Sequence, residues 1–94
     1  MNPERDSKSI YYTYVLRNKE NYFYTGFTYD LRKRLKEHND KKSTYTKYRG
    51  PYELIYYEAC RNENDARQRE KYLKSGTGKR FVKSRLKRFL SRTG

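Results

Sequence analysis

The chain has 94 residues and a formal net charge of +13, from 24 Lys and Arg against 11 Asp and Glu. This length suits one domain with a single modest core. No stretch is apolar enough for a membrane span or a signal peptide. The single Cys60 excludes an internal disulfide and argues against a cysteine-based zinc site. We therefore expect a soluble, cytoplasmic protein that does not insert into membranes.

The charge excess favours polyanionic partners, chiefly nucleic acid and secondarily an anionic membrane surface. Twelve tyrosines strengthen the case for nucleic acid, because tyrosine suits half-buried strands and also stacks on bases. The plain alternative is a charged surface that serves only solubility. A protein partner or a dimer stays open at this stage.

Residues 1–9 are polar and are expected to form a flexible leader before a single domain over residues 10–92. The first element is a strand from Ile10 to Leu16, rich in tyrosine, threonine and branched residues. Residues 18–21 are typical of a turn, and Tyr22 to Thr25 return as a second strand. These two strands are predicted to form a hairpin.

The hairpin is tyrosine-rich, and Gly26 is expected to end its second strand. Side chains alternate between the two faces of a strand. The residues predicted to share faces are Tyr12, Tyr14 and Leu16 on the first strand, and Tyr22 and Tyr24 on the second.

A helix is predicted to begin after the N-cap Asp30 and to end near His38, with Asn39-Asp40 closing it. Helical spacing places Leu31, Leu35 and His38 on its inner side, with Arg34 adjacent. Residues 40–52 follow as a basic loop that ends at Gly50-Pro51.

The third strand is predicted over Glu53 to Cys60. Its alternation places Ile55, Tyr57 and Ala59 on one face and Leu54, Tyr56 and Glu58 on the other. Asn62 or Asn64 is expected to cap a second helix, which Gly76 ends. On this helix Ala66, Glu70 and Leu73 share one face.

Thr77 is predicted to cap a third helix from about Gly78 to Ser91. Its inward residues are Val82, Leu86, Phe89 and Leu90, and its outward residues are Lys79, Lys83, Lys87 and Arg88. The resulting order is β-β-α-β-α-α. This order predicts an α+β fold with a small three-stranded antiparallel sheet flanked by helices.

Chemically useful groups recur along this arrangement. A glycine closes a tyrosine-rich strand at Tyr24-Thr25-Gly26, and the next helix carries Arg34 and His38 one turn apart. Glu70 lies on the otherwise apolar face of another helix, where a carboxylate is costly without a partner. Together these residues supply a phenol, a fixed cation, an imidazole and a candidate metal ligand, which suffice to cut a phosphodiester.

Over about residues 10–90 the chain resembles the GIY-YIG nuclease domain, particularly the small stand-alone bacterial members of the UvrC-like superfamily. Tyr12-Thr13-Tyr14 stands where Gly-Ile-Tyr is expected, and Tyr24-Thr25-Gly26 stands for Tyr-Ile-Gly. Arg34 and His38 have the family spacing, and residues 66–71 match the helix that bears the metal-binding glutamate. The first motif departs from the family pattern, because it lacks both the glycine and the isoleucine.

The resemblance implies that Tyr14 acts as a general base toward the attacking water. An unperturbed tyrosine has a pKa near ~10, so nearby cations or a metal-bound hydroxide must assist. Tyr24 would orient the water or the scissile phosphate, or else pack over the sheet. Arg34 would offset charge on the non-bridging oxygens, its alternative being a solvated surface residue. His38 would relay the Tyr14 proton or bind phosphate, or serve a structural role.

Glu70 would hold one divalent cation, Mg²⁺ or Mn²⁺, which stabilises the leaving oxygen. The alternative is a salt bridge, since four cations lie near it in the sequence: Arg67, Arg69, Lys71 and Lys74. The loop over residues 41–50 interleaves cations, tyrosines and hydroxyls as a nucleic-acid groove does. The expected nucleic-acid contacts are Lys42, Tyr45, Lys47, Arg49, Lys79 and Lys83.

The sequence therefore predicts a Mg²⁺-dependent endonuclease that nicks DNA with low sequence specificity, as in DNA repair, with RNA also open as a substrate. A non-catalytic DNA- or RNA-binding protein that retains the nuclease scaffold is the alternative. A third interpretation is a small basic ribosome-associated protein, supported mainly by charge. Metal dependence separates the first two, because binding to phosphates survives a chelator and weakens with salt.

Overall fold

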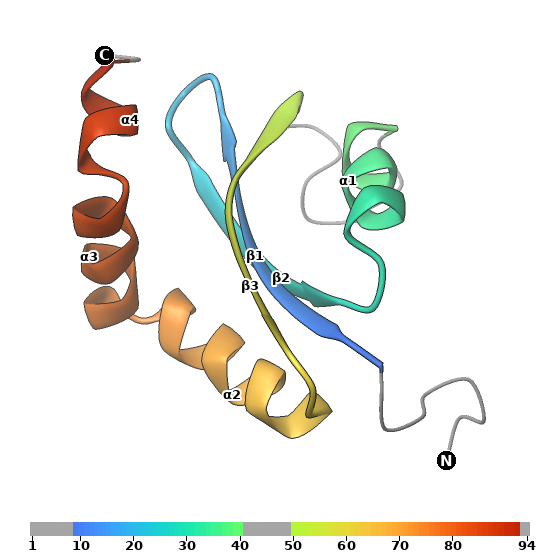
Figure 1. Cartoon of the computed structure of the whole chain (residues 1–94). Helices are drawn as coiled ribbons and strands as arrows, with labels where there is room; N and C mark the ends of the chain where they lie inside the picture. Colours follow the sequence, from blue (N-terminus) through green and yellow to red (C-terminus); the bar gives the residue numbers. More distant parts are fainter. Residues whose placement is uncertain (1–8, 41–49, 93–94) are drawn as a thin grey trace.

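The computed structural model describes residues 9–40 and 50–92, with a three-stranded antiparallel sheet at its centre (Figure 1). The strands are β1 (Tyr11–Asn18), β2 (Phe23–Thr28) and β3 (Tyr52–Cys60), in the order β2-β1-β3. The helices are α1 (Leu31–Asn39), α2 (Glu63–Lys74), α3 (Gly76–Arg85) and α4 (Lys87–Arg92). This arrangement confirms the predicted α+β class and element order, with one helix more at the end of the chain.

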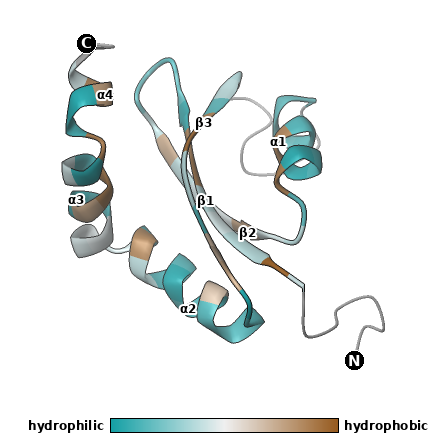
Figure 2. Ribbon diagram, viewed as in Figure 1, coloured by the Kyte–Doolittle hydropathy of each residue, from teal (hydrophilic) through white to brown (hydrophobic). Residues whose placement is uncertain are grey.

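The sheet separates α1 from the other helices (Figure 1). On the α1 face, the buried residues Tyr14, Leu16 and Tyr52 form one cluster. On the opposite face, the buried residues Val15, Leu73 and Val82 form another. Helices α1 and α2 are largely hydrophilic, with isolated hydrophobic residues (Figure 2). Each therefore contributes only a narrow apolar stripe, which fits a chain of only 33% hydrophobic residues.

The first strand of the hairpin is longer than the sequence predicts, and its last residue forms hydrogen bonds within the turn. β1 runs on to Asn18, whose side-chain oxygen accepts hydrogen bonds from the backbone N–H groups of Glu20 (3.0 Å) and Tyr22 (2.9 Å). Strand β2 begins at Phe23, so Tyr22 belongs to the turn. The prediction that Gly26 ends the second strand is wrong: Gly26 lies within β2, paired with Tyr14 of β1.

Strand β3 carries a bulge that changes its predicted faces. The register pairs Val15 with Tyr56 and Leu16 with Leu54, so Ile55 is the extra residue. Ile55 and Tyr56 both pack against the cluster under α2 and α3. Leu54 packs instead with Tyr14 beneath α1. The simple alternation predicted for this strand, with Ile55 opposite Tyr56, is therefore wrong.

The caps of the first two helices follow the sequence. Asp30 accepts from the backbone N–H of Lys33 at 3.1 Å, and Asn62 accepts from that of Asp65 at 3.0 Å. The next junction does not follow it. Helix α2 ends at Lys74, and Ser75 caps α3 by accepting from the Gly78 N–H at 3.1 Å. The predicted Thr77 cap and helix end at Gly76 are therefore wrong.

The predicted helix over residues 78–91 is divided at Leu86, which ends α3 with backbone angles of φ −106° and ψ 24°. The break turns α4 so that Phe89 lies beneath the guanidinium of Arg17, 5.0 Å from the ring centroid. No glycine or proline marks this bend in the sequence. Among the described helices, none has the length and apolarity needed to cross a bilayer.

Candidate active site

The site is built around the Tyr14 side chain, which projects from the central strand across its neighbour. Tyr14 is 2% exposed and is paired with Gly26 in the β1–β2 register. A Cβ atom on Gly26 would lie 2.4 Å from the Tyr14 hydroxyl oxygen. Any larger residue would therefore collide with the ring. Gly26 is needed for this close approach and not for a turn.

Helix α1 supplies two partners for the Tyr14 hydroxyl. His38, 1% exposed, places its Nε2 atom 2.9 Å from the hydroxyl oxygen. Arg34, one turn earlier, donates a hydrogen bond to the same oxygen. Arg34 is also held by Glu37, with 2.8 Å between Nη1 and Oε1. The phenol is thus fixed between an imidazole and a guanidinium.

Two further tyrosines surround the imidazole. The Tyr24 ring centroid lies 4.9 Å from that of His38 and 6.5 Å from that of Tyr14. The Tyr52 centroid lies 6.2 Å from that of His38 on another side. The structure therefore brings Tyr14, Tyr24, Arg34 and His38 together as the sequence predicts, and adds Tyr52.

Asn39 fastens the end of α1 to the start of β3, which places Tyr52 against His38. Its amide accepts from the Tyr52 backbone N–H at 2.7 Å and donates to the Tyr52 carbonyl at 3.1 Å. Sequence reasoning missed both residues, because Asn39 looks like an ordinary helix-closing residue. The only signal was an asparagine directly after the histidine.

Burial controls the protonation of the two central groups. It raises the pKa of the Tyr14 phenol to about 12, although the hydrogen bond from Arg34 acts in the opposite direction. Burial, followed by the nearby Arg34 cation, lowers the pKa of His38 to about 4. At neutral pH the phenol is therefore protonated and the imidazole is neutral. Such an imidazole can accept the phenolic proton through Nε2.

The low pKa of His38 has a consequence for stability in acid. In the unfolded chain His38 is protonated below its ordinary pKa of 6.5, whereas in the folded chain it stays neutral down to about pH 4. Stability should therefore fall as the pH is lowered through this window, by about 2 kcal/mol between pH 7 and pH 5. Urea unfolding at the two pH values measures the change. The His38→Gln variant should lose most of this dependence, and an equal dependence in the variant would contradict the assignment.

Glu70 lies on α2, between the buried residues Ala66 and Leu73 on the same helix face. Its side chain is 20% exposed and pairs with Lys74, with 3.1 Å between Oε2 and Nζ. This is the kind of ion pair that the sequence left open as an alternative. The Glu70 charge also helps to raise the Tyr14 pKa, so the carboxylate lies within electrostatic reach of the phenol.

Cations lie along β2, which is an edge strand of the sheet. The Arg67 guanidinium lies 4.2 Å from the Phe27 ring centroid, and the Lys83 Nζ lies 5.9 Å from that of Phe23. Lys79 is exposed at the start of α3, four residues before Lys83. The other predicted nucleic-acid contacts, Lys42, Tyr45, Lys47 and Arg49, lie outside the described residues.

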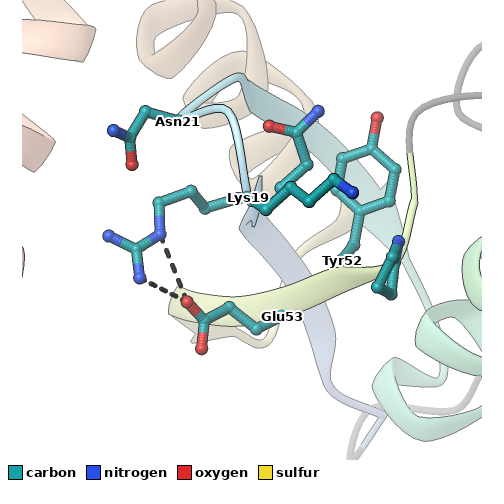
Figure 3. A pocket seen from close by; sticks show the side chains of 7 residues that line it. Lys19, Asn21, Tyr52 and Glu53 are labelled. Carbon is teal, nitrogen blue, oxygen red and sulfur yellow. Dashed lines mark hydrogen bonds and ion pairs between the residues drawn. The ribbon is translucent and has the colours of Figure 1, made fainter. Parts of the chain in front are cut away.

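A hollow of about 400 Å³ lies at the hairpin end of the sheet, lined in part by Lys19, Asn21, Tyr52 and Glu53 (Figure 3). Glu53 forms an ion pair with Arg17, which in turn lies over Phe89. These contacts fasten the hairpin to β3 and α4. Tyr52, which lines this hollow, also lies beside His38.

Residues 10–86 match the family model described as the GIY-YIG catalytic domain. The chain therefore belongs to the GIY-YIG catalytic domain family, as its motifs, strand order and clustered tyrosines indicate. Within the family, it is 45% identical over 71 residues to the UPF0213 protein YazA of Bacillus subtilis, covering 74% of this chain and 72% of that protein. A UPF0213 protein of Clostridium perfringens is 43% identical over 67 residues, covering 70% of this chain and 72% of the relative.

The chain is also similar to a solved structure. The solution structure of a UPF0213 protein from Bacillus halodurans matches with a TM-score of 0.51 and 33% sequence identity. The match covers 80% of this chain and 83% of that one.

Proposed function

We propose that this protein is a metal-dependent nuclease that hydrolyses phosphodiester bonds in DNA and nicks one strand at a time with low sequence specificity. The observation that carries the proposal is the Tyr14 hydroxyl, held between the neutral imidazole of His38 and the guanidinium of Arg34. Membership of the GIY-YIG catalytic domain family supports the same chemistry.

The proton path follows from this geometry. In the His38 tautomer that leaves Nε2 unprotonated, this atom accepts a hydrogen bond from the phenolic O–H, and the imidazole is neutral at physiological pH. As an attacking water loses its proton to the Tyr14 oxygen, the phenolic proton passes to His38. The phenol then acts as a base without resting as a phenolate, which its pKa of about 12 disfavours. Arg34 offsets the charge that develops on the non-bridging phosphate oxygens.

The Glu70 carboxylate supplies oxygen atoms, the type of ligand that hard divalent cations such as Mg²⁺ or Mn²⁺ prefer. Mg²⁺ usually takes one or two carboxylates, with waters and phosphate oxygens completing its shell. The described residues contain no group of three or more His, Cys, Asp or Glu that could hold a metal by themselves, which agrees with that mode. Lys74 is 56% exposed and can swing away from Glu70. A cation held by Glu70 would stabilise the leaving oxygen.

The β2 edge suits the phosphate backbone of a nucleic-acid strand. Arg67 and Lys83 lie over two phenylalanines that are four residues apart on this strand, which corresponds to about 13 Å. Glu70 lies on the same helix as Arg67, less than one turn further along. We assign Lys83 and Lys79 to backbone contacts, and we extend the same proposal to Lys42, Tyr45, Lys47 and Arg49.

A non-catalytic nucleic-acid binder is the second candidate, and one observation favours it. The raised Tyr14 pKa makes the phenol a poor base unless His38 takes its proton. Such a binder would retain the basic β2 edge and the buried cluster, with the hydroxyl serving only to fix α1. Its affinity would fall with salt and would survive a chelator.

The experiment that separates these candidates incubates the protein with supercoiled plasmid and labelled branched DNA, in Mg²⁺, Mn²⁺ or chelator. We expect nicking only with metal, and a loss of about a hundredfold or more in the Glu70→Gln variant. The matched control is Asp65→Asn, which removes an exposed carboxylate from the first turn of the same helix. Binding without nicking in either metal would overturn the nuclease proposal and support the binder.

A further inference from the structure

A second hollow, of about 530 Å³, lies beside α1 and is walled largely by aromatic and aliphatic side chains. Its lining includes Tyr12, Tyr29, Tyr57, Leu31 and Leu54, with Arg32 also contributing. Helical spacing places Arg32 and Arg34 on different flanks of α1. The hollow, named here the tyrosine pocket, therefore lies across α1 from the Tyr14–His38 pair.

The tyrosine pocket exposes the aromatic surface of Tyr57, whose residue is 52% exposed although it lines the cavity. Tyr29 also lines the cavity and is 38% exposed, and its ring packs edge to face against Tyr11 and Phe27. Tyr12 and Tyr57 meet edge to face, with their ring centroids 6.0 Å apart at an angle of 61°. Flat rings at a concave site offer the stacking surface on which proteins hold nucleobases.

The pocket and the candidate active site share neighbouring positions of β1 and β3. Tyr57 lies directly opposite Tyr14 in the β1–β3 register, and Tyr12 lies two residues before Tyr14 on the same strand. Leu31 and Leu54, which line the pocket, also pack against the Tyr14 cluster.

A second connection runs around the start of α1. Tyr29 joins β2 to α1 and forms a hydrogen bond with Arg67 on α2. Arg67 lies over β2 and precedes Glu70 by three residues on α2. A nucleic-acid strand that runs from Glu70 past Arg67 would therefore reach Tyr29 and the mouth of the pocket.

We propose that the tyrosine pocket binds an unpaired nucleobase of the strand that is cut, so that the preferred substrate carries unpaired nucleotides beside the scissile phosphate. Paired bases in a duplex keep their faces stacked and cannot enter. The net charge of +13 favours a nucleic-acid occupant over a second copy of the chain, which it repels. The substrate preference rests on the proposed nuclease function, whereas base binding can be measured without it.

Equilibrium binding in chelator tests base binding alone. Two DNA probes with equal numbers of phosphates are compared. One is a blunt duplex of two separate strands, and the other is a duplex with a single-stranded tail at each end that carries 2-aminopurine. We expect tighter binding of the tailed probe and quenching of 2-aminopurine. Tyr57→Ala should weaken tailed-probe binding roughly tenfold, as loss of one stacked base does. It should leave the blunt probe nearly unchanged, and Tyr57→Phe should retain the preference.

Tyr22→Ala is the matched control, because it removes a tyrosine of similar exposure (46%) from the hairpin turn. Equal weakening of both probes by Tyr57→Ala, or an equal loss in Tyr22→Ala, would overturn the proposal. A dimer that dissociates in Tyr57→Ala, with probe binding unaffected, would overturn it in favour of a second copy.

Cleavage assays with the same probes keep the two proposals distinguishable. If the wild type cuts with Mg²⁺ but Tyr57→Ala still prefers the tailed probe, the pocket assignment fails and the nuclease proposal stands. If the wild type cuts in neither metal, but the Tyr57→Ala substitution removes the tighter binding of the tailed probe, the pocket assignment stands and the nuclease proposal fails.

Discussion

Replacing Tyr14 with phenylalanine is expected to lower the rate of metal-dependent strand cleavage by about a thousandfold. The variant keeps the ring that fills the space over Gly26 but removes the hydroxyl that links His38 to Arg34. General acid–base catalysis by a positioned side chain contributes about 10² to 10⁴ in rate, so most of the activity depends on that oxygen. Initial nicking rates on supercoiled plasmid, at saturating Mg²⁺, measure the loss.

The control is Tyr56→Phe, which removes a hydroxyl on the opposite face of the sheet. The Tyr56 hydroxyl donates to Glu58 at 2.8 Å, and its loss should cost about 1 kcal/mol of stability without affecting nicking. Circular dichroism and urea unfolding verify that both variants are folded. Full activity in Tyr14→Phe would contradict the assignment of the phenol as the base.

Replacing Gly78 with alanine is expected to destabilise the domain by roughly 3 kcal/mol. A Cβ atom at this position would lie 1.9 Å from the Tyr72 carbonyl oxygen and 2.6 Å from the Leu73 Cα atom. Both are backbone atoms of α2, so the collision forces α3 away from its packing position. A domain of this size should lose roughly 10–20 °C in melting temperature.

Gly76→Ala provides the comparison, because an alanine there meets only the end of the Arg80 side chain, at 3.7 Å. Alanine is the better helix former, so this variant should be neutral or slightly stabilised. Thermal unfolding monitored by circular dichroism distinguishes the two. Equal melting temperatures in the two variants would show that α2 and α3 do not need this close approach.

The predictions from sequence succeeded where one local rule decides the outcome. Asp30 was correctly expected to cap its helix, and Asn62 was one of two expected caps of the next helix, because a short polar side chain before an amphipathic run satisfies the first free N–H groups. The one-turn spacing of Arg34 and His38 placed both on the side of α1 that meets Tyr14. The α+β order also followed from the pattern of apolar residues.

The predictions failed where contacts between distant segments decide. Gly26 resembles a strand-ending glycine, and only the Tyr14 ring from the neighbouring strand explains why it lies within β2. The bulge at Ile55 depends on the register of β1. Ser75 replaces Thr77 as the cap because Gly78 must approach α2 closely.

The pKa of Tyr14 also depends on contacts between distant segments of the chain. Its pKa depends on how deeply the folded chain buries the phenol, and the surrounding sequence does not carry that information. The resemblance to the nuclease family named the residue as a base. The structure adds that burial raises the pKa of this phenol to about 12 and that its hydroxyl lies 2.9 Å from Nε2 of His38.

The two hydrogen bonds between Asn39 and the Tyr52 backbone close the chain on both sides of residues 41–49. They hold His38 and Tyr52 in place independently of how many residues lie between them. Lengthening such a closed segment costs little free energy, about 0.6 kcal/mol for each doubling. A change in the length of this stretch should therefore leave the contact between Asn39 and Tyr52, and with it the position of His38, largely undisturbed.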